Sequence, residues 1–205
     1  MRRRDFVLFS AAGFATLSRA SHTWAEGLAP DRKSQGVRIA DAAAAQHGVT
    51  LFYDPSYVRL DYPMGDVPME RGVCADVVIR ALRSCGHDLQ ATVHTDMKAH
   101  FSAYPRTWGL KAPDKNIDHR RVLNLETYFR RKGGALTGGN DGLRAGDLVT
   151  WRLPGSLPHI GIVGTQTTRD RARPLIVHNV GAGVQIEDVL EAWPVVGRFR
   201  FPVTL

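Results

Sequence analysis

The residues best suited to chemistry are a cysteine at an expected helix start and two histidines in expected strands. Cys74 follows a loop that ends near Gly72, and it opens a helical pattern that runs towards Gly86. The unpaired N–H groups and the positive dipole end of a helix stabilise a thiolate, so they predict a thiol pKa below the free value of roughly 8.5. This position is typical of a nucleophilic cysteine.

A thiol nucleophile needs a base within hydrogen-bond reach and a third group that orients the base. His159 begins an apolar stretch that predicts a strand, and His178 lies near the end of the next one. In an antiparallel hairpin, the start of one strand lies beside the end of its neighbour. The spacing therefore predicts that His159 is the general base and that His178 orients it, with Asn179 as the alternative for the orienting role.

The second cysteine, Cys85, is not expected to form a disulfide with Cys74. On one helix their Cα atoms would lie roughly 16 Å apart, at about 1.5 Å per residue, whereas a disulfide needs less than about 7 Å. Cys85 precedes Gly86, which fits an apolar side chain in the last helical turn before a glycine cap. We expect Cys85 to be structural.

The elements that must position these residues follow from caps, hydrophobic spacing and turn residues. Ser34 and Asp88 are predicted helix caps, and the glycine-rich stretch 133–142 is predicted to be a mobile surface loop. Helices followed by antiparallel strands predict an α+β domain, with the N-terminal helices packed on a C-terminal antiparallel β-sheet. The predicted helices cover residues 34–47, 74–85, 89–103 and 125–132, and the predicted strands cover 147–153, 159–165, 174–180, 184–189 and 195–201.

Residues 1–25 have the layout of an export signal peptide. Arginines at positions 2–4 precede an apolar run over 6–17, and small residues follow as far as Ala25. The apolar run falls well short of the roughly 20 residues that span a bilayer, so we expect no membrane span after cleavage. The segment Arg3-Arg4-Asp5-Phe6-Val7 resembles a twin-arginine signal, with general secretion as the alternative. Either route predicts a periplasmic or otherwise exported protein.

Residues 26–205 are long enough for one well-packed domain, and we expect a monomer. Cleavage after Ala25 would lower the formal net charge from +7 to +4, because four arginines and one aspartate leave. A mildly basic domain suits an anionic surface such as cell-wall polymer. No nucleic-acid-binding motif is present, so we do not expect a nucleic-acid partner.

Several segments resemble a known superfamily. Tyr62-Pro63-Met64-Gly65, then Cys74 at a helix start, His159 in a His-Ile-Gly-Ile-Val strand and His178 at the end of the next strand resemble the NlpC-type cell-wall cysteine peptidases. The resemblance implies a papain-like, NlpC-type fold. Residues 65–74, 117–121 and 178–183 also resemble a family of exported bacterial proteins known only as a domain of unknown function.

This resemblance implies roles for particular residues. Cys74 is the expected nucleophile, His159 the base and later the acid, and His178 the orienting residue. Tyr62 matches the NlpC-type tyrosine near the nucleophile, so its hydroxyl is expected to join the Cys74 backbone N–H in an oxyanion hole. The chain departs from the usual Asp-Cys-Ser-Gly motif, because it has Val73-Cys74-Ala75-Asp76. That departure affects the expected substrate contacts more than the nucleophile.

A charged segment precedes the last predicted helix. We expect Asp118, His119, Arg120 and Arg121 to form a wall of the cleft that recognises an anionic group, since arginine binds carboxylates in a bidentate manner. A solvated loop is the alternative. His94, Asp96 and His100 do not have the helical spacing of a zinc site, so we expect no metal and no cofactor.

Together these features predict an exported cysteine amidase or peptidase that acts on peptidoglycan peptides. Two alternatives stay open at this point. One is a non-catalytic protein that binds or scaffolds the cell wall, and the other is an acyltransferase or esterase that uses the same Cys-His-His site.

Overall fold

The computed structural model describes residues 34–201, which belong to one compact unit. The predicted signal peptide, residues 1–25, lies outside the described residues, as do residues 26–33 and 202–205 of the predicted domain. Among the described residues, no helix is both long enough and apolar enough to cross a membrane.

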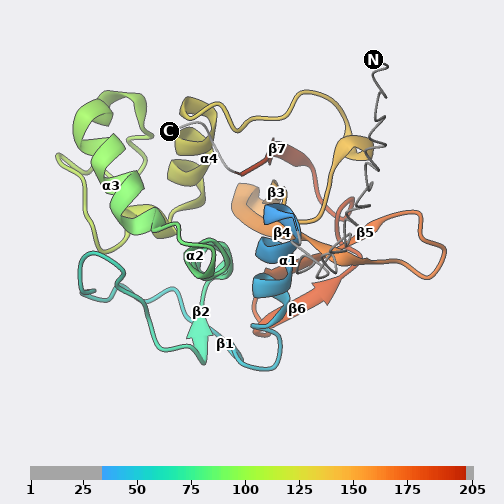
Figure 1. The fold of residues 1–205 in the computed structure, drawn as a ribbon. Helices are drawn as coiled ribbons and strands as arrows, with labels where there is room; N and C mark the ends of the chain where they lie inside the picture. Colours follow the sequence, from blue (N-terminus) through green and yellow to red (C-terminus); the bar gives the residue numbers. More distant parts are fainter. Residues whose placement is uncertain (1–33, 202–205) are drawn as a thin grey trace, which may run out of the picture. The chain divides into compact units, whose positions relative to one another are not determined.

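Helices come first along the chain and strands last, as the sequence predicts (Figure 1). Within residues 34–201, the α-helices are α1 (Gln35–Ala44), α2 (Cys74–Ser84), α3 (Leu89–His100) and α4 (Val122–Arg131). Short 3₁₀ helices are η1 (Phe101–Ala103), η2 (Asp118–Arg120), η3 (Asn140–Gly142) and η4 (Pro154–Ser156). The strands are β1 (Phe52–Tyr53), β2 (Arg71–Gly72), β3 (Leu148–Leu153), β4 (Leu157–Thr167), β5 (Pro174–Asn179), β6 (Val184–Glu187) and β7 (Val195–Phe199).

The C-terminal strands form one antiparallel sheet in the order β6-β5-β4-β3-β7. A separate parallel pair, β1 with β2, leads directly into α2. Helices α1 and α2 both pack on β4 and β5, and α4 packs on β4 and β7. The predicted α+β class, with N-terminal helices on a C-terminal antiparallel sheet, is confirmed.

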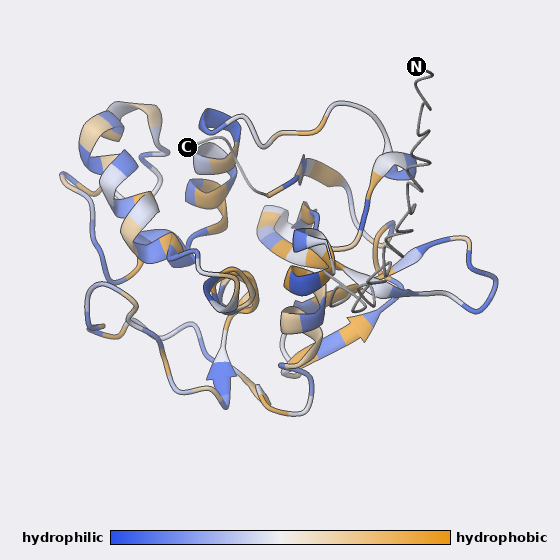
Figure 2. Ribbon diagram, in the orientation of Figure 1, coloured by the Kyte–Doolittle hydropathy of each residue, from blue (hydrophilic) through white to orange (hydrophobic). Residues whose placement is uncertain are grey.

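Alternating side chains give the sheet two apolar faces. The face under the helices carries Leu148, Ile160, Ile162 and Val177, which pack with residues of α1, α2 and α4. The other face carries Trp151, Val163 and Ile176, which pack with Leu190 and Trp193 in the segment between β6 and β7. The helices place their hydrophobic stripes against this core, as the banding of α4 shows (Figure 2). The two-sided burial fixes the strand register, because a one-residue slip would exchange the faces.

Helix starts show which sequence signals were reliable. Ser34 caps α1, since its Oγ accepts the Val37 N–H at 3.3 Å, and Asp88 caps α3 through the Gln90 N–H at 2.9 Å. Helix α4 begins at Val122, three residues before its predicted start, because its N-cap is Arg121, which makes no side-chain capping bond. Such a start has no sequence signature.

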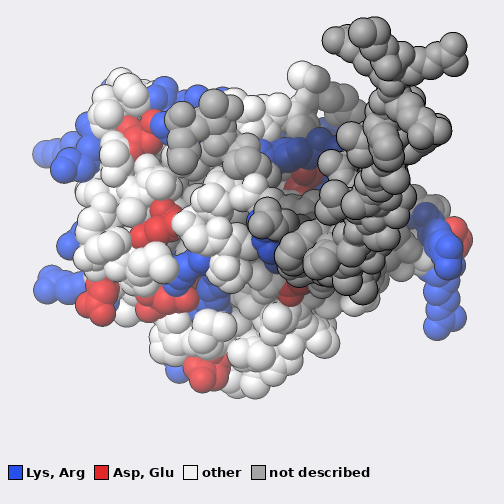
Figure 3. All heavy atoms as spheres, in the orientation of Figure 1, with Lys and Arg blue, Asp and Glu red and all other residues white. Residues whose placement is uncertain are grey.

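The stretch 133–142 is held in place at its first half, so the prediction of a mobile loop is wrong there. Leu136 donates its N–H to the Arg198 carbonyl at 2.9 Å, and Arg200 donates to the Gly134 carbonyl at 2.8 Å. These bonds add a short extra strand-like segment to β7. On the face shown in Figure 3, basic and acidic side chains are interspersed among uncharged surface, so charge does not single out a binding region on the described part of that face.

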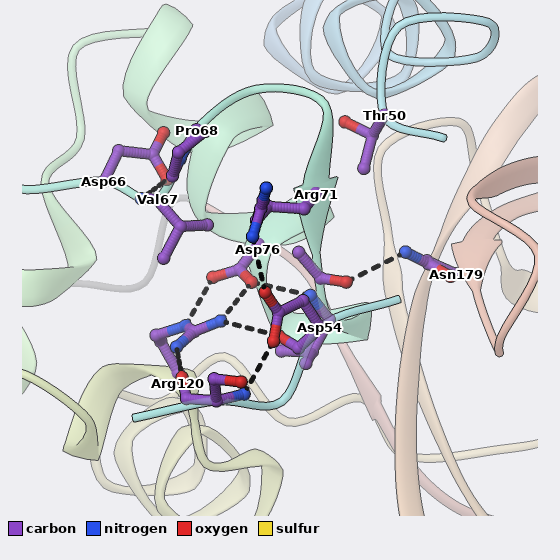
Figure 4. A network of polar contacts seen from close by, with 12 residues as sticks. Thr50, Asp54, Asp66, Val67, Pro68, Arg71, Asp76, Arg120 and Asn179 are labelled. Carbon is purple, nitrogen blue, oxygen red and sulfur yellow. Dashed lines mark hydrogen bonds and ion pairs between the residues drawn. The ribbon is translucent and has the colours of Figure 1, made fainter. Parts of the chain in front are cut away.

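A buried ion pair fixes the start of α2. Arg120 donates from Nε to Asp76 Oδ1 at 2.9 Å and from Nη2 to Asp76 Oδ2 at 2.8 Å, and both side chains are almost fully buried. The same carboxylate accepts the Val73 N–H at 2.6 Å and so caps the helix. Arg120 also donates to the carbonyls of Asp54 and Ser56 (Figure 4). One arginine therefore ties η2 to the first turn of α2 and to the loop after β1.

Two arginines on α2 order the loop that precedes it. Arg80 is buried, and both Arg80 and Arg83 bind the carboxylate of Asp66. Arg80 also donates to backbone carbonyls of the loop, namely those of Val67, Pro68 and Arg71. The chain segment that leads into Cys74 is thus held by Arg80 and Arg83 as well as by the Asp76–Arg120 pair.

We predict that removing one partner of the buried ion pair strongly destabilises the protein. Arg120→Met leaves the Asp76 carboxylate buried without its opposite charge, which should lower the free energy of unfolding by about 3–5 kcal/mol. Urea denaturation followed by circular dichroism measures this change. The control is Arg173→Met, because the Arg173–Asp188 pair is 40% and 37% exposed and should contribute little. If both variants lost the same small amount of unfolding free energy, the Arg120–Asp76 pair would not stabilise the start of α2 as argued.

Candidate active site

Cys74 is the first residue of α2, and its side chain is buried at the helix start. The capped first turn points backbone N–H groups towards this end of the helix. Both cysteines are free thiols, as expected from their separation along α2. Cys74 therefore occupies the position that the sequence predicts.

The thiol pKa, however, is opposite to the prediction. The pKa of the Cys74 thiol is raised to about 11, mainly by burial and to a smaller extent by the neighbouring Asp76 carboxylate. Hydrogen bonds from the backbone of Ile160, Ala75 and Cys74 itself favour the thiolate but do not compensate. The helix position is present, yet desolvation of the charged form outweighs it. Cys74 is thus a neutral thiol at pH 7.

His159, His178 and Glu187 form a continuous hydrogen-bonded chain. His159 Nε2 lies 2.9 Å from His178 Nδ1, and His178 Nε2 lies 3.0 Å from Glu187 Oε2. The two rings are buried, whereas the Glu187 side chain is 46% exposed. The structure therefore brings the two predicted histidines together and adds a carboxylate that the sequence reasoning missed.

The strand register explains this meeting. Ile162 pairs with Val177, which places Gly161 opposite His178 and His159 on the same face, two residues away. A Cβ atom at Gly161 would lie 3.1 Å from the His178 Cβ, so the missing side chain leaves room for the His178 ring to reach His159. Glu187 stands in the same diagonal relation to His178, whose direct partner on β6 is Gln185. The contact of Glu187 with His178 depends on how β5 pairs with β6, and that pairing could not be read from the sequence.

The hydrogen-bonded chain fixes the tautomers of both rings. A carboxylate only accepts, so His178 Nε2 carries a proton that it donates to Glu187. Burial lowers the pKa of His178, although Glu187 partly opposes this, and the ring is neutral with an unprotonated Nδ1. His159 must then donate from Nε2, which leaves its Nδ1 unprotonated and able to accept a proton. This is the state that a general base requires.

Indole rings enclose the two histidines. The His159 ring centroid lies 5.8 Å from that of Trp151 and 5.7 Å from that of Trp193, and His178 also contacts Trp193. Burial lowers the pKa of His159 to about 3, and the neighbouring His178 lowers it too. The base is therefore neutral throughout the physiological range.

The residues on both sides of His159, not its ring, adjoin Cys74, because the ring lies on the sheet face of Trp151 and Ile160 lies on the face of α2. The backbone of Ile160 hydrogen-bonds the Cys74 sulfur, and Pro158 lines the same pocket as Cys74. Among the described contacts there is no hydrogen bond between the thiol and the His159 ring. The ring nitrogen that is left for the thiol is Nδ1, because Nε2 is bonded to His178.

A pocket of about 200 Å³ opens beside Cys74. Its wall comes from the loop after β1, the start of α2, the segment from Trp108 to η2, the start of α4 and the start of β4. The lining residues are Tyr53, Pro55, Val73, Cys74, Trp108, Ile117, Arg120, Val122, Leu123 and Pro158.

The tyrosine in this pocket is Tyr53, not the predicted Tyr62. Tyr62 instead packs edge-on against His94, at 5.5 Å between ring centroids, with Lys115 over its face. The charges of Cys74 and Asp76 act on Tyr53, and mainly burial raises the pKa of Tyr53 to about 12. Its hydroxyl is therefore protonated and can donate. The prediction used spacing along the chain, whereas the pairing of β1 with β2 brings Tyr53 to the start of α2.

Asn179 does not share the orienting role. Its Nδ2 donates to the Gly72 carbonyl at 3.1 Å, and its Oδ1 accepts the Gly181 N–H at 3.2 Å (Figure 4). Asn179 thus ties the end of β5 to the residues before Cys74. Of the two residues, it is His178 whose ring contacts the His159 ring.

The segment from Asp118 to Arg121 is mostly interior, contrary to the predicted anion-binding wall. Asp118 accepts the Asp114 N–H at 2.6 Å and pairs with Arg121, whose guanidinium lies 4.1 Å from the Trp108 ring centroid. Burial lowers the pKa of His119 to about 4, so this buried ring is neutral. Arg120 lines the pocket, but its guanidinium is bound to Asp76. Asp118 and Arg121 thus pair within the segment, and Arg120 pairs with Asp76, which lies 44 residues away.

Comparison with known proteins gives a family. Residues 40–201 match the family described as Domain of unknown function (DUF1287). The chain belongs to this family. It is 57% identical over 165 residues, 80% of each chain, to Uncharacterized protein YijF from Escherichia coli (strain K12). The family of unknown function that the sequence resembles is thereby confirmed.

Among solved structures, this DUF1287 chain is similar to NlpC1 from Trichomonas vaginalis. The TM-score is 0.48 at 14% sequence identity, and the match covers 84% of this chain and 46% of that chain. This chain therefore spans less than half the length of that protein.

The raised thiol pKa predicts a particular alkylation profile for this DUF1287 protein. In a Cys85→Ser background, iodoacetamide should react with Cys74 at a rate that rises about tenfold per pH unit from pH 6 towards about 11, because only the thiolate reacts. Mass spectrometry of the labelled peptide measures the rate. A rate that already levels off below pH 7 would reveal a preformed thiolate–imidazolium pair and contradict the neutral pair.

The hydrogen-bonded chain predicts a tautomer that can be observed without activity. Nitrogen NMR of the folded protein should show His159 protonated at Nε2 and unprotonated at Nδ1. Glu187→Leu removes the acceptor and should mix the tautomers of both rings, whereas Glu187→Gln retains an acceptor oxygen and should preserve them. Unchanged spectra in Glu187→Leu would show that Glu187 does not set the tautomers.

Proposed function

We propose that this protein is an exported cysteine hydrolase that cleaves amide bonds of cell-wall peptides through Cys74 and His159. The observation that carries the proposal is the chain Glu187-His178-His159. It leaves the His159 Nδ1 unprotonated, one residue along β4 from Ile160, whose backbone hydrogen-bonds the Cys74 sulfur. The proposal therefore requires the His159 ring to turn from the Trp151 face of the sheet towards Cys74. A structural pair of buried histidines would need no such fixed tautomer.

The neutral state of both groups determines the order of events. With a thiol pKa of about 11 and an imidazole pKa of about 3, proton transfer in the resting protein is unfavourable. Transfer from Sγ to His159 Nδ1 therefore accompanies the attack of sulfur on the substrate carbonyl carbon. The imidazolium that forms keeps its Nε2 bond to His178, which spreads the charge towards Glu187.

Donors for the developing oxyanion lie at the same place. Backbone N–H groups at the start of α2 face the reacting sulfur, and the protonated Tyr53 hydroxyl shares the pocket with Cys74. His159 then gives its proton to the leaving amine, the C–N bond breaks, and an acyl group remains on Sγ. Water, deprotonated by His159, hydrolyses this thioester and regenerates the thiol.

Two features of the sequence support the parts of this proposal that concern export and a cell-wall substrate. The signal-like residues 1–25 support export, and the mildly basic remainder suits an anionic polymer surface. Neither feature identifies the bond that is cut.

Replacing the nucleophile tests the proposal directly. Cys74→Ala should lower the release of peptide fragments from purified cell wall by at least about 10⁴-fold, because no other thiol lies at the site. Fragments are measured by liquid chromatography and mass spectrometry, and circular dichroism checks the fold. Cys85→Ser is the matched control and should retain activity. Fragment release by Cys74→Ala at the rate of the unaltered protein would refute the nucleophile, and a protein that binds cell wall without releasing fragments would be a scaffold.

A further inference from the structure

The pocket beside Cys74 is almost entirely hydrocarbon. Apart from Cys74 and Arg120, its lining consists of apolar or aromatic side chains and two prolines. One lining residue, Arg120, belongs to the segment 118–121 that the sequence predicted to recognise an anion. The chemistry of the lining therefore differs from that prediction.

The one charged residue in the lining is already neutralised. Arg120 directs Nε and Nη2 to the two oxygens of Asp76, and Nη1 lies 3.3 Å from the Ser56 carbonyl. A carboxylate entering the pocket would lose water and would have to compete with a bidentate buried partner. The neighbouring Arg121 is likewise paired, with Asp118 at 3.1 Å. Charged groups are therefore disfavoured here.

The mouth of the pocket continues this apolar character. Tyr53 and Trp108, which belong to the lining, are 40% and 37% exposed. Leu157, next to the lining residue Pro158, is 62% exposed. Large apolar side chains held in water beside a reactive group mark a contact surface for an apolar ligand.

We propose that this pocket binds the acyl side of the substrate, and that the acyl group is an uncharged hydrocarbon of about six carbons. The inference rests on the proposed function, because it concerns the group that becomes attached to Sγ. The size follows from comparison, since an apolar cavity of about 150 Å³ holds benzene and this pocket has about 200 Å³. In a peptide, the same limit restricts cleavage to bonds whose acyl-side residue is uncharged.

A series of 4-nitrophenyl esters tests the acyl group by itself. Cys74 Sγ attacks the ester carbonyl, the bond to the nitrophenyl oxygen breaks, and the thiol proton passes through His159 to nitrophenolate. Water then releases the carboxylic acid and restores the thiol. Each turnover thus consumes one ester and one water, and the release of nitrophenol is followed by absorbance, with Cys74→Ala as the background.

The expected result is a length-dependent kcat/KM. Each methylene from acetyl to hexanoyl should raise kcat/KM about three- to fourfold, and longer chains should gain nothing more. The glutaryl ester, which matches the pentanoyl ester in carbon number but ends in a carboxylate, should react at least about 100-fold more slowly.

A filled pocket provides the specific control. Leu123 is a half-buried lining residue, and Leu123→Trp should move the best substrate from hexanoyl to acetyl by filling the pocket. Leu136→Trp places the same side chain at a half-buried leucine outside the lining, and it should leave the length profile unchanged. A general loss of folding would lower all esters equally and would not shift the optimum.

The outcomes separate the two proposals. Cys74-dependent hydrolysis that is equal for acetyl and hexanoyl, or faster for glutaryl than for pentanoyl, would overturn the apolar acyl pocket and leave the hydrolase intact. Hydrolysis of every ester at the Cys74→Ala rate would overturn the hydrolase, and the acyl pocket with it.

Discussion

The buried ion pair between Asp76 and Arg120 is the interaction on which the site depends. Asp76 caps the helix that begins with Cys74, and Arg120 fastens that cap to the loop after β1 and to η2. These segments supply most of the wall around the thiol. A buried ion pair seldom gives more stability than apolar side chains of similar volume would give at the same positions. Here the ion pair fixes how three segments lie against one another, although no sheet or helix joins them: the start of α2, η2 and the loop after β1.

The same ion pair has a chemical consequence. Asp76 raises the pKa of Cys74, so the residue that fixes the nucleophile also opposes its ionisation. Arg120 binds that carboxylate through Nε and Nη2. Burial of the thiol and of His159 acts in the same direction and keeps both groups neutral. In the proposed mechanism, the start of α2 would act less by holding a resting thiolate than by offering N–H groups to the charge that develops during attack.

Local signals in the sequence were sufficient to predict the helices and strands. They were not sufficient to predict which residues of different elements contact one another. Ser34 and Asp88 identified helix starts because capping is decided within a few residues. His159 and His178 were paired from strand ends because any antiparallel hairpin has that geometry. Glu187 depends on the register of β5 and β6, Tyr53 on the pairing of β1 with β2, and Arg120 on a partner 44 residues away. These are long-range facts that no local pattern encodes. The thiol pKa was mispredicted for the same reason, because helix position is local and burial is not.

An apolar pocket and a neutral thiol–imidazole pair are mutually consistent. Water near Sγ would lower the cost of a thiolate, whereas the hydrocarbon lining and the two indoles around His159 keep the surroundings at low polarity. An uncharged acyl group that fills the pocket removes the remaining water without introducing a charge that would have to be paired. In such surroundings the hydrogen bonds from the start of α2 and from Tyr53 act strongly on the one charge that appears, the oxyanion. In the proposed reaction, selectivity for the acyl group and stabilisation of the oxyanion would have a common origin, which is the apolar lining at the start of α2.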